Sequence, residues 1–190
     1  MIFTAPIIAT GTGCTLLRAA NWLAPLQSAC DKYAINAPLR IAAFLATIGV
    51  ESGEMQWTAE IWGPTAAQKA YEPPSRKASE LGNTQKGDGL RFKGRGLVQI
   101  TGRRNYMLAA MGLELDLLNH PELLEQPGNA AMSAAWYWAN RNLNALADAG
   151  NFLGLSRAVN LGSASSTATP NGWTQRAALY AAAKQAMEIA

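Results

Sequence analysis

The sequence feature that most constrains the fold is a run of apolar residues over residues 38–53. The residues that recur there at intervals of three and four are Ile41, Phe44, Leu45 and Ile48. This spacing places them on one face of a helix. Pro38 suits the first position of the helix, and Gly53 predicts its end. Most other segments show similar spacing and few alternate as strands do, so the sequence predicts a mainly α fold.

Glu51 lies on the apolar face of this predicted helix, three positions after Ile48. A charge on such a face is costly unless it is paired or neutralised. Two interpretations follow. Glu51 is either salt-bridged or reaches solvent at the helix end, or it is a proton donor whose pKa is raised by an apolar wall. The helix alone does not separate these interpretations.

Residues 92–106, FKGRGLVQITGRRNY, combine glycines with polar and apolar side chains. Gly94 and Gly96 allow unusual backbone conformations and the close approach of another group. Gln99 and Thr101 are two positions apart, which would put them on one side of an extended chain. The segment is either a glycine turn leading into a short buried strand, or a polar ledge lining a cleft. The density of polar groups between apolar anchors favours the ledge.

Composition bounds the class of protein. The chain has 190 residues, of which 49% are apolar and 15% charged, so we predict one globular domain over residues 1–190. The net charge of +3 and the pI of about 9.0 suit approach to an anionic bacterial envelope. There is no Lys/Arg stripe, so no nucleic-acid partner is predicted.

Hydropathy and the N-terminal sequence lead to an expectation about location. No stretch approaches the roughly 18 apolar residues of a membrane span, so we predict no stable membrane insertion. The first residues lack the positive start and the long apolar run of a signal peptide. We therefore expect a protein made in the cytoplasm.

The residue inventory excludes several kinds of catalysis. His120 is the only histidine, and it leads into a predicted short helix that opens with Pro121. Cys14 and Cys30 are expected to be reduced and structural. The chain therefore has almost no histidine for a His-ligated zinc site or a Ser-His-Asp triad, and we predict no metal and no cofactor.

Carboxylates remain as the candidate catalytic groups. Glu60 follows Glu51 by nine positions, in a predicted loop over residues 54–63. Two carboxylates close to a polar ledge suit hydrolysis of a glycosidic bond. One carboxyl group protonates the leaving oxygen, and the other activates water or attacks the sugar.

The remaining segments are read mostly as helices. Pro25 is expected to kink or split a helix over residues 15–34, and Gly112 to end a helix that starts after Gly102. Irregular segments are predicted at residues 80–89 and 163–172. Other helices are predicted at residues 64–72, 121–125, 129–140, 143–149, 152–159 and from Trp173 onward. We interpret Trp136, Tyr137 and Trp138 as core residues.

Four segments resemble glycoside hydrolase family 19, which comprises the plant-type chitinases and related phage and prophage endolysins. They are FLATIGVESG (44–53), FKGRGLVQITGRRNY (92–106), AVNLG (158–162) and RAALY (176–180). The spacing GRG-x-x-Q-x-T-G-x-x-NY is specific. The intervening EIWGPTAAQKAYE, with LGN and GDG, resembles the endolysin branch. The similarity runs from about residue 38 to residue 180, and residues 1–37 form an N-terminal helical part.

The resemblance implies a lysozyme-like α-helical fold of two lobes, with the substrate cleft between them and no metal. It implies that Glu51 is the general acid and Glu60 the general base of an inverting reaction, with Thr101 helping to hold the water. An inverting pair is expected to be about 6.5–9.5 Å apart. The substrate-binding residues that it implies are Gln99, Asn105, Tyr106, Asn160 and Arg176.

Two positions depart from the family pattern. Val50 stands where relatives commonly have histidine, which removes a polar neighbour of Glu51 but not the acid itself. Glu54 follows Gly53 where many relatives have a second glycine. Glu54 is therefore a rival for the second carboxylate. If the helix continues to residue 54, it shares a face with Glu51.

The expected function is that of a monomeric endolysin that hydrolyses β-1,4 bonds between the amino sugars of peptidoglycan and causes host lysis. It would be made in the host cytoplasm and reach the periplasm after holin-type release. A chitinase acting on chitin oligomers is the first alternative. A wall-binding protein without activity is the alternative from another class.

Overall fold

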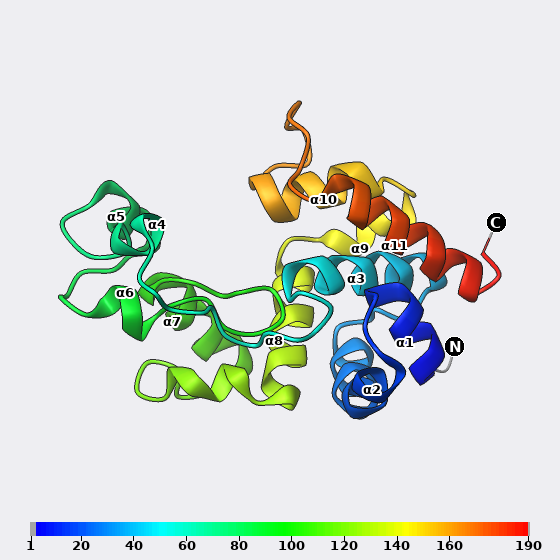
Figure 1. The fold of residues 1–190 in the computed structure, drawn as a ribbon, viewed down its shortest axis with the longest axis horizontal. Coiled ribbons are helices and arrows are strands. Elements are labelled where there is room, and N and C mark those ends of the chain that lie inside the picture. The colour runs from blue at the N-terminus through cyan, green and yellow to red at the C-terminus, as the bar shows by residue number, and fades with distance from the viewer. Residues whose placement is uncertain (1–2, 190) are drawn as a thin grey trace.

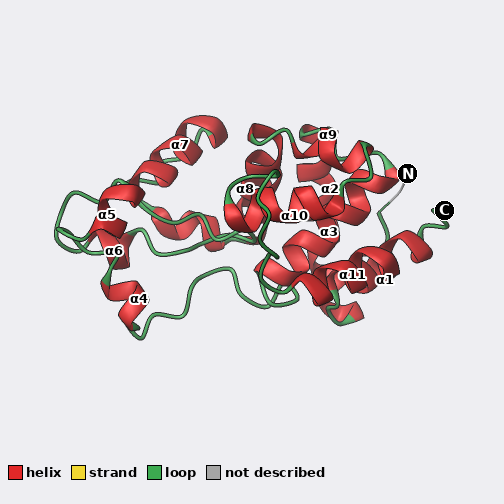
Figure 2. Cartoon of the chain, turned by 90° about the horizontal axis from the view of Figure 1, so that it is seen from above, coloured by secondary structure: helices red, strands yellow, loops and turns green. Residues whose placement is uncertain are grey.

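The computed structural model describes residues 3–189, and helices dominate that part of the chain (Figures 1 and 2). The mainly α prediction is confirmed. The elements in chain order are α1 (Ala5–Thr12), α2 (Leu16–Lys32), α3 (Pro38–Glu51), α4 (Ala66–Lys69), α5 (Arg76–Leu81), α6 (Asp88–Arg91), α7 (Arg103–Leu113), η1 (Pro121–Glu125), α8 (Pro127–Asn140), α9 (Leu143–Asp148), α10 (Phe152–Leu161) and α11 (Trp173–Ala186).

Helix α3 is the centre of the larger lobe. Residues 41–49 of α3 are buried without interruption, because α1, α9 and α11 pack around the helix. Phe44 meets Trp138 of α8 edge to face, with 5.3 Å between ring centroids. The apolar face predicted from the sequence is thus only part of a helix that is buried on nearly every side.

A second hydrophobic cluster forms the smaller lobe, around α7 and η1. Its buried members are Phe92, Ile100, Tyr106, Ala109, Leu113, Leu117 and Leu124. Met132 and Tyr137 of α8 pack against both clusters. Figure 1 shows α8 between the group of α4 to α7 and the group of α1, α3 and α11. The molecule therefore has two lobes that share one helix.

Helix α2 is continuous, where the sequence predicted a kink or a split at Pro25. Pro25 lies inside α2 and removes one backbone donor, but the helix runs unbroken from Leu16 to Lys32. Trp22, Leu26 and Ala29 on α2 are buried, and α2 packs along α8. We attribute the continuity to this packing, which outweighs the local cost of the proline.

Helix α7 also differs from the prediction, because it continues through Gly112 to Leu113. A Cβ atom added at Gly112 would lie 2.0 Å from the indole Nε1 of Trp136 on α8. Gly112 is therefore required for the close approach of α7 and α8, and it does not end the helix.

Several short elements had no counterpart in the sequence prediction. Helix α1 was not predicted, and α5 and α6 each overlap one end of the segment 80–89 that was expected to be irregular. Asp88 organises this region. Its carboxylate accepts hydrogen bonds from the backbone N–H groups of Thr84 and Gln85, at 2.8 and 3.0 Å, and forms an ion pair with Arg103 at 2.5 Å.

Cys14 and Cys30 are both buried and unpaired with each other, which confirms their reduced, structural reading. Within residues 3–189, no helix is both long enough and apolar enough to span a membrane.

Candidate active site

Glu51 and Glu60 line the same cavity, although they come from different elements. The cavity has a volume of about 260 Å³. Glu51 is the last residue of α3, and Glu60 lies in the loop that follows. The other lining residues are Ser52, Gly53, Trp57, Ala59, Ile61 and Gln99. The two carboxylates singled out from the sequence are thus brought to one site together with Gln99.

Glu51 is held by a buried cation. The guanidinium of Arg176 on α11 donates a hydrogen bond to Glu51 Oε1, and the Arg176 side chain is only 2% exposed. Arg176 Nε also donates to the carbonyl of Asn171 at 2.9 Å. The Asn171 N–H donates to Asn160 Oδ1 at 2.8 Å. Asn160 and Arg176 thus secure loop 163–172 and orient Glu51 from behind.

This arrangement changes the role assigned to Asn160 and Arg176. The resemblance implied that both line or support the cleft as substrate-binding residues, and neither lines the cavity shared by Glu51 and Glu60. Arg176 is buried beneath Glu51, and Asn160 contacts the backbone of the neighbouring loop. In this conformation Arg176 orients Glu51, and Asn160 holds the loop segment that contacts Arg176.

Glu60 is held by uncharged donors. Its Oε2 accepts a hydrogen bond from the Gly94 N–H at 3.0 Å, and its Oε1 accepts one from Gln68 Nε2 at 3.0 Å. Its backbone pairs with the glycine-rich segment, because the Glu60 N–H donates to the Gly94 carbonyl at 2.8 Å. Gln68 is nearly buried, so the carboxylate of Glu60 has a fixed orientation.

Gly94 lies between Glu60 and the polar side chains of Gln99 and Thr101. A Cβ atom at this position would be 2.6 Å from Gln99 Oε1 and 3.2 Å from Thr101 Oγ1. The absence of a side chain therefore lets Gln99 and Thr101 approach the backbone that holds Glu60. The sequence indicated that this glycine allows close approach, but it did not reveal Glu60 as a neighbour.

Gln99 and Thr101 face a common pocket, but not for the reason predicted. Residues 95–100 form a tight turn closed by an antiparallel bridge between Arg95 and Ile100. Gln99 has a φ of 53°, so the segment is not an extended strand. The Thr101 hydroxyl donates to the Gln99 carbonyl at 2.8 Å, which links the two residues.

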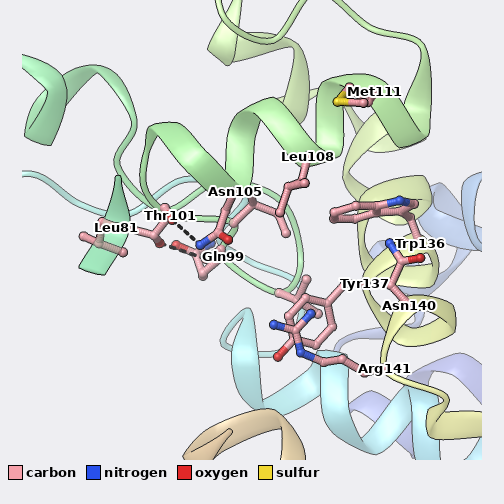
Figure 3. A pocket seen from close by; sticks show the side chains of 12 residues that line it. Leu81, Gln99, Thr101, Asn105, Leu108, Met111, Trp136, Tyr137, Asn140 and Arg141 are labelled. Carbon is pink, nitrogen blue, oxygen red and sulfur yellow. Dashed lines mark hydrogen bonds between the residues drawn. The ribbon is translucent and has the colours of Figure 1, made fainter. Parts of the chain in front are cut away.

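A larger cavity of about 570 Å³ lies beside these residues, between α7 and α8 (Figure 3). Gln99, Thr101 and Asn105 line one side of this cavity, and Trp136, Tyr137, Asn140 and Arg141 line the other. Gln99 lines both cavities, so the larger one lies next to the carboxylate site. Burial raises the pKa of Tyr137; the charge of Arg141 opposes that shift and the charge of Glu51 adds to it.

Tyr106 lines neither of these two cavities, although the resemblance implied that it binds substrate. Its side chain is fully buried in the smaller cluster. The Tyr106 hydroxyl donates to the Lys93 carbonyl at 2.7 Å and accepts from Arg95 Nη1 at 3.0 Å. Burial raises the pKa of this hydroxyl, which keeps it neutral. Tyr106 therefore supports the glycine-rich segment from below.

Glu54 points away from the paired carboxylates. Helix α3 ends at Glu51, and Glu54 has a left-handed φ of 61°. The Glu54 side chain lies near Gly13, after α1. Because Glu54 does not line the cavity of Glu51 and Glu60, the geometry favours Glu60 as the second carboxylate.

Some site residues were missed from the sequence. Trp136 and Tyr137 are half-buried pocket residues, and of the aromatic run only Trp138 is a core residue. Gln68 also had no role in the prediction. The aromatic run is apolar on both sides in the sequence, and no local signal separates its exposed edge from its buried one. Within residues 3–189 there is no cluster of three or more His, Cys, Asp or Glu side chains suited to a metal ion.

The geometry describes a two-lobed α-helical protein whose cleft carries two carboxylates and a row of amide and hydroxyl groups. Residues 12–149 match the family described as chitinase class I, glycoside hydrolase family 19. The chain therefore belongs to this family. Asn160 and Arg176 lie beyond the matched residues, so their assignment rests on the contacts given above.

Comparisons with individual proteins agree with this membership. Endochitinase 2 of Gossypium hirsutum is 36% identical over 104 residues, which are 52% of this chain and 34% of that protein. A glycosyl hydrolase family 19 domain-containing protein of Haemophilus influenzae is 35% identical over 85 residues, 40% of each chain. The chain thus spans well under half the length of these relatives.

Solved structures show the same fold. A bacterial family 19 chitinase superposes with a TM-score of 0.71 at 22% identity, covering 100% of this chain and 97% of that one. Chitinase C of Streptomyces griseus gives a TM-score of 0.70 at 20% identity, covering 98% of this chain and 76% of that one. The lysozyme-like fold class predicted from the sequence is therefore confirmed.

Proposed function

We propose that this chain is a glycoside hydrolase that cleaves β-1,4 bonds between the amino sugars of peptidoglycan by an inverting mechanism. The observation that carries the proposal is that Glu51 and Glu60, from two different elements, line one cavity together with Gln99. Family membership supports the class of reaction. The choice of peptidoglycan over chitin rests on the endolysin-like sequence between residues 60 and 90.

Glu51 acts as the general acid in this proposal. It gives its proton to the glycosidic oxygen, and the sugar on the other side of the bond becomes an oxocarbenium-like centre. The carboxylate that remains on Glu51 is stabilised by the guanidinium of Arg176, which is already in contact with Oε1. This stabilisation requires no rearrangement, because Asn171 holds Arg176 in place.

Glu60 acts as the general base. The Gly94 N–H and Gln68 Nε2 aim its carboxylate, which takes a proton from the attacking water. The Thr101 hydroxyl donates to the Gln99 carbonyl, so its oxygen lone pairs are available to accept a hydrogen bond from that water. Gln99 and Asn105 offer amide groups to the hydroxyl and acetamido groups of the sugars.

The mechanism is tested by the configuration of the first product. Proton NMR during hydrolysis of a soluble amino-sugar oligomer should show the α anomer first, because water attacks opposite the leaving group. The β anomer as first product would overturn the inverting mechanism. Mass spectrometry of fragments from purified peptidoglycan should then show which sugar carries the new reducing end.

Chitin hydrolysis is the second candidate, and the names of the relatives favour it. The plant relatives are endochitinases, and both substrates contain N-acetylglucosamine. Rates on purified peptidoglycan and on chitin oligomers of matched length should be compared with one enzyme preparation. Activity confined to chitin would replace peptidoglycan as the substrate.

The biological role that we propose is host lysis by an endolysin made in the cytoplasm. A holin-type pore would give it access to the periplasmic peptidoglycan, and the pI of about 9.0 suits an anionic wall. Expression in a Gram-negative cell should leave the culture intact until the inner membrane is permeabilised, and turbidity should then fall. Lysis without permeabilisation would contradict holin-type release.

A further inference from the structure

The cavity between α7 and α8 is lined by a charged side chain, which binding of neutral sugars alone does not require. Arg141 is the single charged side chain among its lining residues. Its guanidinium carbon lies 3.7 Å from the centroid of the Tyr137 ring, so the cation is stacked and held at the cavity wall. Among the ion pairs of residues 3–189, none includes Arg141.

A stacked arginine keeps the edge of its guanidinium available. The aromatic ring covers one face of the plane, while the N–H groups still point outward in the fork that matches a carboxylate. No side-chain hydrogen bond of Arg141 to another part of the described chain satisfies those groups. The cavity therefore offers a guanidinium group that has no ion-pair partner among the described residues.

Apolar side chains form the other end of the same cavity. Leu108 and Met111 on α7 are 47% and 74% exposed, and Trp136 on α8 faces them. Figure 3 shows these three side chains together at the end of the pocket away from Thr101. The ligand that fits this cavity thus combines small apolar groups with a carboxylate, attached to a chain of amino sugars that reaches Gln99.

We propose that this cavity binds the lactyl-peptide substituent carried by alternate sugars of peptidoglycan, with Arg141 pairing with a peptide carboxylate. The inference rests on the proposed function, because it assumes that the glycan strand lies along Gln99 and the two carboxylates. Leu108, Met111 and Trp136 contact the methyl groups of the lactyl and alanyl units. Chitin carries neither group, so the cavity determines specificity for the peptide-bearing polymer.

The test uses a ligand that the enzyme cannot cleave. N-acetylmuramyl tripeptide has one sugar and no glycosidic bond, and its amidated form has the same shape without the peptide carboxylates. Binding of both to the wild-type enzyme is measured by NMR titration. We expect the acid form to bind about 10-fold more tightly, with shifts at Trp136, because a charge-assisted pair is lost in the amidated form.

Variants locate the charge recognition. Arg141→Gln should bind both forms equally, and Arg141→Lys should keep only part of the preference because it loses the stacked fork. Arg76→Gln is the matched control, since Arg76 is an exposed arginine on α5 that does not line the cavity. Thermal unfolding of each variant checks that the fold is intact.

The outcomes separate this inference from the proposed function. Equal binding of the two forms by the wild-type enzyme, no measurable binding of either, or an unchanged preference in Arg141→Gln would each overturn the inference. Hydrolysis of purified peptidoglycan by the same preparation tests the proposed function independently. An enzyme that hydrolyses peptidoglycan but binds the acid and amidated tripeptides equally would support the proposed function and overturn the role proposed for this cavity.

Discussion

The two carboxylates of the cleft are held in different ways. Glu51 ends a buried helix of the larger lobe and contacts the buried cation of Arg176. Glu60 lies on a loop, and neutral donors from Gly94 and Gln68 orient it. The contact with Arg176 stabilises a negative charge on Glu51, whereas the neutral donors mainly fix the orientation of the Glu60 carboxylate. This difference matches an acid that must part with its proton and a base that must aim at a water.

The largest expected effect is that of Glu51→Gln. Loss of a general acid should lower kcat by about 10³- to 10⁴-fold on natural glycans. The loss should be much smaller on a nitrophenyl glycoside, because that leaving group departs without protonation. The control is Glu54→Gln, an exposed carboxylate three positions away, which should change either rate by less than about 2-fold. Equal losses on both substrates would remove Glu51 from the role of acid.

Glu60→Gln should have the next largest effect, with kcat reduced by about 10²- to 10³-fold. Activation of water is needed for every substrate, so the reduction should be similar for natural glycans and for the nitrophenyl glycoside. Comparison of the two variants on the two substrates assigns acid and base without a structure of a complex. A nitrophenyl substrate that restores the activity of Glu60→Gln would reverse our assignment.

Gly94→Ala tests the junction between Glu60 and the ledge. The added methyl group would displace Gln99, because it would lie 2.6 Å from Gln99 Oε1. We expect stability to fall by about 1–3 kcal/mol and kcat to fall by about 10-fold, since small misplacements reduce rates strongly. Gly128→Ala is the control, because a Cβ there meets no atom within 4 Å. Activity and chemical denaturation should be measured together, and a fully active Gly94→Ala would contradict the close approach.

The smallest expected effect concerns Asp88, which pairs with Arg103 of α7 in the smaller lobe. Burial alone would raise the pKa of Asp88, but Arg103 and two backbone N–H groups together lower it. Its stabilising contribution is therefore present above the unfolded-state pKa of about 3.9 and is lost as pH falls below that value. Asp88→Asn should unfold more easily at pH 7, by about 1–3 kcal/mol, and show a weaker acid dependence.

Asp148→Asn in the larger lobe is the matched control for that measurement. Asp148 pairs with Arg40 but is 44% exposed, so its loss should cost less than about 1 kcal/mol. Denaturant unfolding of both variants from pH 7 to pH 3 compares the two lobes directly. An Asp148→Asn variant that is destabilised more than Asp88→Asn would show that the larger lobe depends more on its ion pair.

The sequence predicted the parts of the site that local patterns control. The position of Glu51 at the end of an apolar helix follows from spacing alone, and the glycines at 94 and 96 indicate close approach. Contacts between segments that are distant in the sequence do not follow from local patterns. Gly112 was read as a stop because the sequence does not show that Trp136 packs against it. The partner of Glu51, Arg176, was connected to the cleft only through the family resemblance.

The predictions from the sequence failed mainly for backbone conformation and for side-chain exposure. Gln99 and Thr101 share a pocket through a left-handed residue in a turn, whereas the two-residue spacing suggested a strand. Tyr106 has the same neighbours in sequence as the pocket residues, but it is buried because α7 turns it toward the smaller core. Packing of α2 along α8 likewise outweighed the local effect of Pro25.

Gln68 gives the site an unusual dependence on a very short helix. The same side chain accepts the Thr65 N–H in the capping box of α4 and donates to Glu60. Fraying of these four residues would therefore release Glu60, the proposed base, from its orientation. Local opening of α4 would therefore also inactivate the site. Any ligand that requires an ordered Glu60 would in turn protect the backbone amides of α4 from hydrogen exchange.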